Sequence, residues 1–160
     1  MATPEETHGQ SEAGDRRCGF VTVLGPTNAG KSTLVNALVG TKVAIVSHKV
    51  QTTRALIRGI AVEGQSQIVF LDTAGIFNPK RRLDRAMIDA AWSGLEDADA
   101  VLLVIDAAAG PDDDVMAIVQ RLKTARMKRI AVLNKIDRVE DKPKLLALAK
   151  RLDQELAFDR

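Results

Sequence analysis

One loop near the start of the chain contains the residues best suited to binding phosphate. Gly25 is followed by four residues and then by Gly30, Lys31 and Ser32, between an apolar run and a helical pattern. Glycines let the backbone turn tightly, so that successive N–H groups converge on phosphate oxygens at the positive end of the following helix. Lys31 can reach the outer phosphates, and the Ser32 hydroxyl is a hard oxygen that suits Mg2+. This phosphate-binding loop, or P-loop, predicts contacts from Gly25, Pro26, Thr27, Asn28, Ala29, Gly30, Lys31, Ser32 and Thr33. The alternative is a strand-to-helix turn without a ligand.

A second motif, Asp72-Thr73-Ala74-Gly75, directly follows the apolar run 68–71. Ligands of open α/β sheets gather at the carboxyl ends of the strands, so Asp72 is expected beside the P-loop, holding Mg2+ through water. The Gly75 N–H could bind a terminal phosphate, and glycine allows the backbone to move when that phosphate leaves. We expect all four residues, and Ile76 after them, to line a nucleotide site. Without the P-loop, the motif would predict only a turn.

A third motif, Asn134-Lys135-Ile136-Asp137, follows the apolar run 130–133. A carboxylate such as that of Asp137 can accept hydrogen bonds from both N1–H and the 2-amino group of guanine. Adenine has neither donor, so it would leave the acceptor unpaired. Asn134 could tie the motif to the P-loop or to the base, and the stem of Lys135 could cover one face of the ring. The motif therefore favours GTP over ATP, although alone it would predict only a polar turn.

The polar stretch 41–54 contains two threonines that could respond to a bound nucleotide. The Thr53 hydroxyl is expected to complete a Mg2+ shell with Ser32 and Asp72 only when the γ-phosphate is present, which would make this loop a switch. Thr52 is the alternative ligand. His48, in the same stretch, is expected to be exposed or structural rather than catalytic.

Length and composition set limits on the rest of the interpretation. The chain has 160 residues, 46% hydrophobic and 28% charged, which suits one globular domain. A net charge of +2 gives no case for strong non-specific nucleic-acid binding by the whole chain. Cys18 is the only cysteine, so the sequence excludes an intramolecular disulfide and suits a reducing compartment. The first residues lack the pattern of a signal peptide, and no apolar run could span a membrane, so we expect a cytosolic protein.

Apolar runs and helical patterns alternate along the chain, which predicts an α/β fold with a mainly parallel sheet flanked by helices. Residues 1–17 are polar and lack periodicity, so a disordered tail is expected before a domain that starts at residue 18. The runs 55–62 and 67–71 predict an antiparallel hairpin, and the continuous runs 100–105 and 129–133 predict buried parallel strands. Helices are expected over 33–39 and 80–95, from Pro111, and from Lys142 with Leu145, Ala149, Leu152 and Leu156 on one face.

A basic run, 121–129, ends the helix predicted to begin near Pro111. Its five cations and no acid could form a nucleic-acid patch. Basic residues in the last turn of a helix are also favoured by the helix dipole. We therefore favour a solvated face over a nucleic-acid patch.

The motifs Gly-x4-Gly-Lys-Ser, Thr-Thr-Arg, Asp-Thr-Ala-Gly and Asn-Lys-Ile-Asp together resemble translation-factor-class GTPases. Within that class the sequence is similar to the Era family of bacterial ribosome-assembly GTPases, most specifically over 42–54, and the likeness covers residues 18–158. The resemblance implies a G domain with bound GTP or GDP and Mg2+, which hydrolyses GTP slowly and acts in small-subunit assembly and rRNA maturation. The alternatives are a related tRNA-modification or ribosome-biogenesis GTPase and a nucleotide-dependent binding module with negligible turnover.

The resemblance also implies partners. Family members bind small-subunit ribosomal RNA and the pre-30S particle, mainly through a C-terminal KH domain that is absent here. We expect a monomer in the cytoplasm, with peripheral association with the inner membrane as a further implication of the resemblance.

Two departures from related GTPases affect the predicted chemistry. Ile76 stands where many small GTPases have a catalytic glutamine, and it cannot orient a water molecule by hydrogen bonding. In related proteins an asparagine at the position of Asn28 helps to bind K+, so we expect K+ to stimulate hydrolysis. The expected catalytic residues are Asn28, Lys31, Thr53 and Gly75, and the expected metal ligands are Ser32, Thr53 and Asp72.

The second departure concerns the end of the chain. The family continues with a further strand, a Ser-Ala loop that contacts the guanine oxygen, and a closing helix, and no Ser-Ala pair follows Asp137 here. We therefore expect a G domain over 18–160 that lacks its last strand and helix. The sheet would then end on the strand 130–133, with an uncovered edge.

Overall fold

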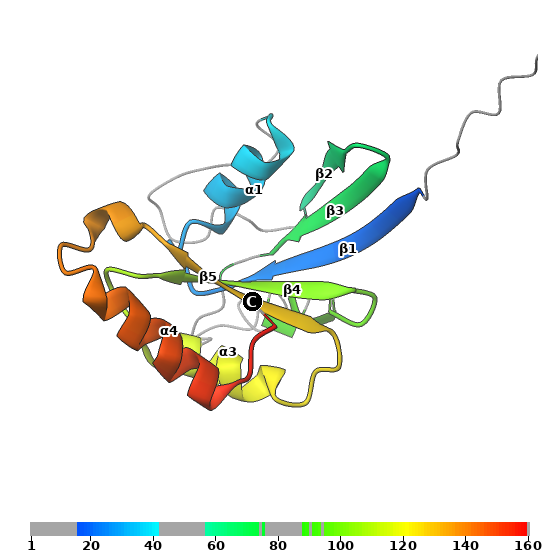
Figure 1. Ribbon diagram of the computed structural model, residues 1–160. Coiled ribbons are helices and arrows are strands. Elements are labelled where there is room, and N and C mark those ends of the chain that lie inside the picture. Colours follow the sequence, from blue (N-terminus) through cyan, green and yellow to red (C-terminus); the bar gives the residue numbers. More distant parts are fainter. Residues whose placement is uncertain are drawn as a thin grey trace, which may run out of the picture.

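The structure, a computed structural model, describes residues 16–41, 57–73, 75, 88–89, 91–93 and 95–159. Within these ranges, five strands form one sheet with helices on both of its faces (Figure 1). The elements in chain order are β1 (Arg17–Leu24), α1 (Lys31–Val39), β2 (Ile57–Glu63), β3 (Ser66–Asp72), β4 (Ala100–Asp106), α3 (Asp113–Leu122), β5 (Lys128–Asn134), the short 3-10 helix η1 (Ile136–Arg138) and α4 (Pro143–Glu155).

The sheet has the strand order β2-β3-β1-β4-β5. β2 and β3 form the predicted antiparallel hairpin, while β1 pairs in parallel with β3 and β4, and β4 with β5. The register places Val23 opposite Asp72 and Asp106 opposite Asn134. The carboxyl ends of β1, β3, β4 and β5 therefore lie at the same end of the sheet, as predicted.

Two apolar layers form the core, one on each face of the sheet. Successive strand residues point to opposite faces, so Leu24 packs towards α3 and α4, whereas Val23 packs towards α1. The same alternation along β4 sends Leu103 and Ile105 to the first layer and Val104 to the second. Because both faces are covered, the strands are continuous apolar runs rather than alternating ones.

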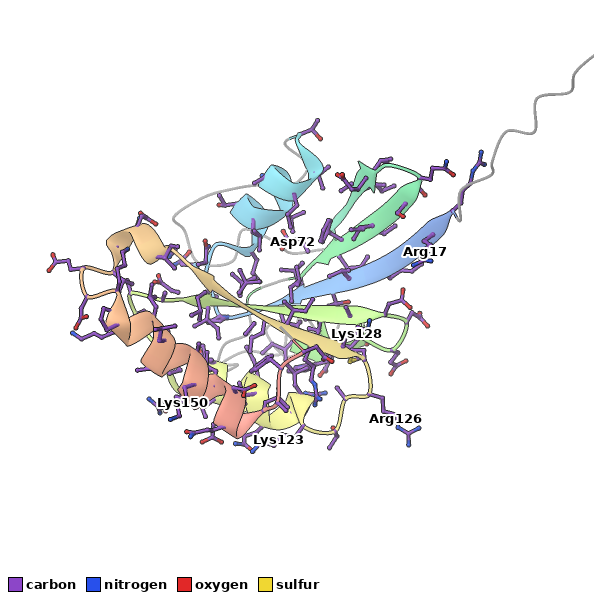
Figure 2. All side chains as sticks on the ribbon, in the orientation of Figure 1. Arg17, Asp72, Lys123, Arg126, Lys128 and Lys150 are labelled. Carbon is purple, nitrogen blue, oxygen red and sulfur yellow. The ribbon has the colours of Figure 1, made fainter. Side chains whose placement is uncertain are left out.

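α3 begins where the sequence predicts but ends earlier. The Asp112 carboxylate accepts a hydrogen bond from the Val115 N–H at 2.9 Å and caps the helix. The helix ends at Leu122, so the basic run 121–129 spans the helix end, a connection and the start of β5 (Figure 2). Arg121 stacks over the Trp92 ring at 4.1 Å, and Lys123 pairs with Glu155 at 3.7 Å. These contacts agree with a solvated, intramolecularly paired surface.

The apolar face of α4 differs from the prediction at one position. Leu152 and Leu156 are buried, and Leu145 is partly buried, but Ala149 is exposed and Leu148 packs against the core instead. Spacings of three and four residues are both compatible with one helix face. Packing against the sheet selects the larger leucine, which buries more apolar surface.

Other predicted segments are described only in part. β1 already begins at Arg17, while residues 1–15 of the predicted tail lie outside the described residues. Of the helix predicted over 80–95, residues 88–89 and 91–93 are helical, and Leu95 is in a turn. Among the described residues, no helix has the length and apolar character needed to cross a membrane.

β5 is the end strand of the described sheet, as predicted. Apart from the exposed Lys128, its residues are partly buried, whereas the central residues of β4 are buried. The last described residues reach this edge, because the Asp159 N–H donates to the Arg129 carbonyl and the Arg129 N–H donates to the Asp159 carboxylate, both at 2.8 Å.

The burial pattern of α4 can be tested by two identical substitutions in the same helix. Leu152 is 1% exposed and Leu146 is 77% exposed. Leu152→Ala is expected to lower the free energy of unfolding by about 2–5 kcal/mol, because it leaves a cavity. Leu146→Ala is expected to change it by no more than about 0.5 kcal/mol. Urea denaturation measures both values, and equal losses would contradict the described packing of α4.

Candidate functional site

The three predicted motifs meet at the end of the sheet where the parallel strands have their carboxyl ends. The P-loop follows β1, the Asp72 motif ends β3, and the Asn134 motif ends β5. Figure 2 marks Asp72 close to α1, while Arg17 lies at the opposite end of the sheet. The parallel pairing of these strands brings together motifs that are far apart in the sequence.

Lys31 is the centre of the P-loop. It is the first residue of α1 and only 6% exposed, and its ammonium donates to the carbonyl oxygens of Gly25 at 3.1 Å and Pro26 at 2.9 Å. Burial lowers the pKa of Lys31 from 10.5 to about 8, and the negative charge of Asp72 opposes this only in part. An additional anion at this place would favour the charged form of the lysine.

Glycine is required at both ends of the P-loop. Gly30 has φ 99°, and a Cβ there would collide with the side-chain amide of Asn134. Gly25 has φ 151°, and a Cβ there would collide with the Val104 carbonyl oxygen on β4. The glycines therefore permit the turn itself, and they also let the P-loop lie close to β4 and to the end of β5.

The Asp72 motif lies against the P-loop. The Ser32 hydroxyl donates to the Asp72 carboxylate at 2.8 Å, and Asp72 is fully buried. The Thr73 hydroxyl donates to the Val23 carbonyl at 2.7 Å, which ties the motif to β1. Gly75 approaches Thr27 so closely that a Cβ would lie 2.8 Å from the Thr27 Cα. Two hard oxygen donors, from Ser32 and Asp72, thus lie together beside the P-loop, which fits the ligand chemistry of Mg2+.

The Asn134 motif holds the P-loop from the other side. Asn134 donates from its side-chain amide to the Ala29 carbonyl at 2.8 Å. Of the two partners predicted for Asn134, the P-loop and the base, it therefore binds the P-loop. The Lys135 ammonium donates to the adjacent carbonyl, that of Asn28, at 2.6 Å. Asp137 lies in η1 and is exposed, as is Ile136. An exposed carboxylate at this end of the sheet is accessible to a nucleotide base.

Several predicted site residues lie outside the described residues. These are Thr52, Thr53, Ala74 and Ile76, together with His48. Thr33 is described and exposed, in the first turn of α1. Thr53 as a metal ligand, Gly75 as a phosphate donor and Asn28 as a catalytic residue remain predictions.

Asp106 also lies at this site, although it belongs to none of the three predicted motifs. It ends β4, and its carboxylate accepts from the Lys135 ammonium at 2.6 Å and from the N–H groups of Ala108 and Ala109 at 3.0 and 3.2 Å. Burial alone would raise the pKa of Asp106, but these hydrogen bonds and the Lys135 charge hold it below its usual value. Its position after an apolar run is the signal that also identified Asp72 and Asn134.

Fold and site together define a P-loop GTPase domain. Residues 20–135 match the family described as 50S ribosome-binding GTPase, and the chain belongs to this family.

Known relatives support the predicted resemblance to Era. The chain is 57% identical to GTPase Era of Brucella suis biovar 1 (strain 1330) over 152 residues, which are 95% of this chain and 49% of that protein. It is 57% identical to GTPase Era of Bradyrhizobium sp. (strain ORS 278) over 158 residues, 99% of this chain and 50% of that protein. The chain thus spans about half the length of these relatives.

Solved structures give the same result. Era in complex with MgGDPNP and nucleotides 1506–1542 of 16S ribosomal RNA superposes with a TM-score of 0.83 at 38% identity, covering 90% of this chain and 50% of that one. A variant of Aquifex aeolicus Era bound to GDP and AlF4− has a TM-score of 0.81 at 38% identity, covering 88% of this chain and 49% of that one.

Proposed function

We propose that this protein binds GTP and GDP together with Mg2+ and hydrolyses GTP to GDP and phosphate, as a switch protein. The observation that carries the proposal is that the guanine motif contacts the same P-loop whose carbonyls hold the buried Lys31. Asn134 and Lys135 contact two successive P-loop carbonyls, those of Ala29 and Asn28. The predicted phosphate and base sites are therefore neighbouring parts of one continuous site.

The proposed reaction is in-line attack of water on the γ-phosphate. The water oxygen bonds to the γ-phosphorus while the bond between that phosphorus and the bridging oxygen breaks; GDP leaves, and both hydrogens of the water end on the released phosphate. Lys31 exchanges its carbonyl partners for phosphate oxygens, where its charge and the P-loop amides stabilise the charge that develops. Ser32, Asp72 and Thr53 would hold Mg2+, Asp72 through water, and Gly75 would bind the γ-phosphate. Bound Mg2+ supplies neutralisation of the phosphate charge.

Stimulation of hydrolysis is assigned to K+. Ile76 replaces the glutamine that could orient water, so water positioning has to come from another group, and the K+ charge would substitute for an arginine finger. Asn28 is exposed and has a left-handed backbone with φ 60° in the P-loop. We assign Asn28 to K+ binding beside the phosphates. No general base is identified, which is consistent with a slow intrinsic rate.

The biological role is proposed from similarity to Era. An Era structure contains a segment of 16S ribosomal RNA, so the proposed partners are small-subunit rRNA and the pre-30S particle. The proposed role is in small-subunit assembly and rRNA maturation. The RNA contact is assigned mainly to the C-terminal KH domain implied by the resemblance. The proposed state is a cytoplasmic monomer that associates peripherally with the inner membrane.

Phosphate release from GTP tests the activity. With Mg2+ present, single-turnover release is expected to be several-fold faster in KCl than in NaCl, and excess ATP is expected not to compete. Equal rates in the two salts would refute the role of K+. Tight GTP binding with negligible release would favour a binding module without turnover, and competition by ATP would refute the guanine site.

Asp137→Asn tests the base site. An amide can accept from N1–H and donate to a 2-carbonyl, so the variant should prefer xanthine to guanine nucleotides, with GTP affinity reduced about a hundredfold. Asp141→Asn is the matched control, because Asp141 is exposed and forms a surface ion pair with Lys144 at 3.6 Å. Nucleotide titrations measure both variants, and unchanged GTP preference in Asp137→Asn would refute the assigned base site.

The pKa of Lys31 predicts proton uptake on binding. In the free protein burial lowers this pKa to about 8, and a bound phosphate should raise it again. GDP binding should therefore take up a proton above about pH 8, and the Kd should rise up to about tenfold per pH unit between about pH 8 and pH 9. Calorimetry in buffers of different ionisation enthalpy measures the uptake. The control Lys144→Met, at an exposed position, should retain the proton uptake. If the unmodified protein takes up no proton on GDP binding, the proposed rise in the pKa of Lys31 is wrong.

A further inference from the structure

We propose that Asp106 is a positioning residue for the nucleotide site, holding Lys135 so that its stem lies along the base and its ammonium supports the P-loop. This inference rests on the proposed binding of guanine nucleotides. It assigns a role to a carboxylate that belongs to none of the three motifs.

The first observation is a single ammonium group shared by two partners. Lys135 Nζ lies 2.6 Å from the Asp106 carboxylate and 2.6 Å from the Asn28 carbonyl oxygen. The side chains of Lys135 and Asp106 are 22% and 21% exposed, so water screens this ion pair less than a surface pair. The lysine therefore links the end of β4 to the P-loop.

The second observation is the backbone conformation of the linked residues. Among the described residues, Asn28 and Lys135 are the two non-glycine residues with positive φ, 60° and 58°. Such a conformation is disfavoured for residues with a Cβ, and contacts from the surroundings have to maintain it. The hydrogen bond from Lys135 to Asn28 joins these two residues to each other.

The third observation is that Asp106 is itself fixed. Its carboxylate accepts from the N–H groups of Ala108 and Ala109, and sheet pairing places Asp106 opposite Asn134. The ammonium of the adjacent Lys135 is thereby held at a defined place. With the charge neutralised, the apolar stem of the lysine is the part available to a base.

Removal of the carboxylate would have a specific consequence. Lys135 would lose its counter-charge, and its ammonium would gain more from water than from one carbonyl. The base would lose its cover, and Asn28 would lose its partner. Recognition of the 2-amino group would be retained, because that belongs to Asp137.

A double-mutant cycle on the purified protein tests the inference. Asp106→Asn keeps an acceptor for the Ala108 and Ala109 N–H groups but removes the charge that pairs with Lys135. GDP binding is expected to weaken about tenfold in Asp106→Asn and similarly in Lys135→Met, with no further loss in the double variant. The ratio of GDP to IDP affinity should stay unchanged in Asp106→Asn, since IDP lacks only the 2-amino group.

The control is Asp99→Asn, whose carboxylate accepts from the Phe20 N–H at the opposite end of the sheet. It should bind GDP as the unmodified protein does. Binding stoichiometry and the thermal midpoint separate loss of folded protein from loss of affinity. If Asp106→Asn does not fold, Asp106→Ser enters the same cycle, because a hydroxyl can also accept from the turn.

Three results would overturn the inference: unchanged affinity in the Asp106 variant, additive losses in the double variant, or an altered ratio of GDP to IDP affinity. Absence of GDP binding in the unmodified protein would instead refute the proposed function. The two failures are therefore distinguishable.

Discussion

The buried ammonium of Lys31 is the constraint on which the site depends. It lies at the start of α1, where the helix dipole disfavours a cation, and the first turn contains no acidic residue. Two carbonyl dipoles and the charge of Asp72 stabilise it, but burial still lowers its pKa. A bound anion would relieve both penalties, so the free protein is arranged to attract negative charge at this place.

The sheet places a motif on each side of the P-loop. β1 is flanked by β3 and β4, so the P-loop has a neighbouring strand end on each side. Gly75 packs against Thr27 from one side, and Asn134 contacts Gly30 and Ala29 from the other. Because these contacts involve backbone atoms, a shift of either motif would require the P-loop to move as well.

Much of this could be predicted from the sequence, because the governing interactions are local or follow from strand order. Continuous apolar runs predict strands covered on both faces, and Pro111 predicts a nearby helix start. The exposure of Ala149 could not be predicted, since two helix spacings fit one face until the partner surface is known. The role of Asp106 could not be predicted in the same way, because it depends on Lys135, a lysine 29 residues further along the chain that the pairing of β4 with β5 brings near.

The two lysines of the site differ in a way that would orient a nucleotide. Lys135 is paired with a carboxylate at 2.6 Å, so its charge is compensated before any ligand binds. Lys31 is held by carbonyl oxygens, and the Asp72 charge does not outweigh its burial. Anionic phosphates would therefore be attracted to the Lys31 end, while an uncharged base would meet the neutralised Lys135 end. The difference in charge compensation between the two lysines would thus orient the nucleotide along the P-loop before any hydrogen bond to guanine forms.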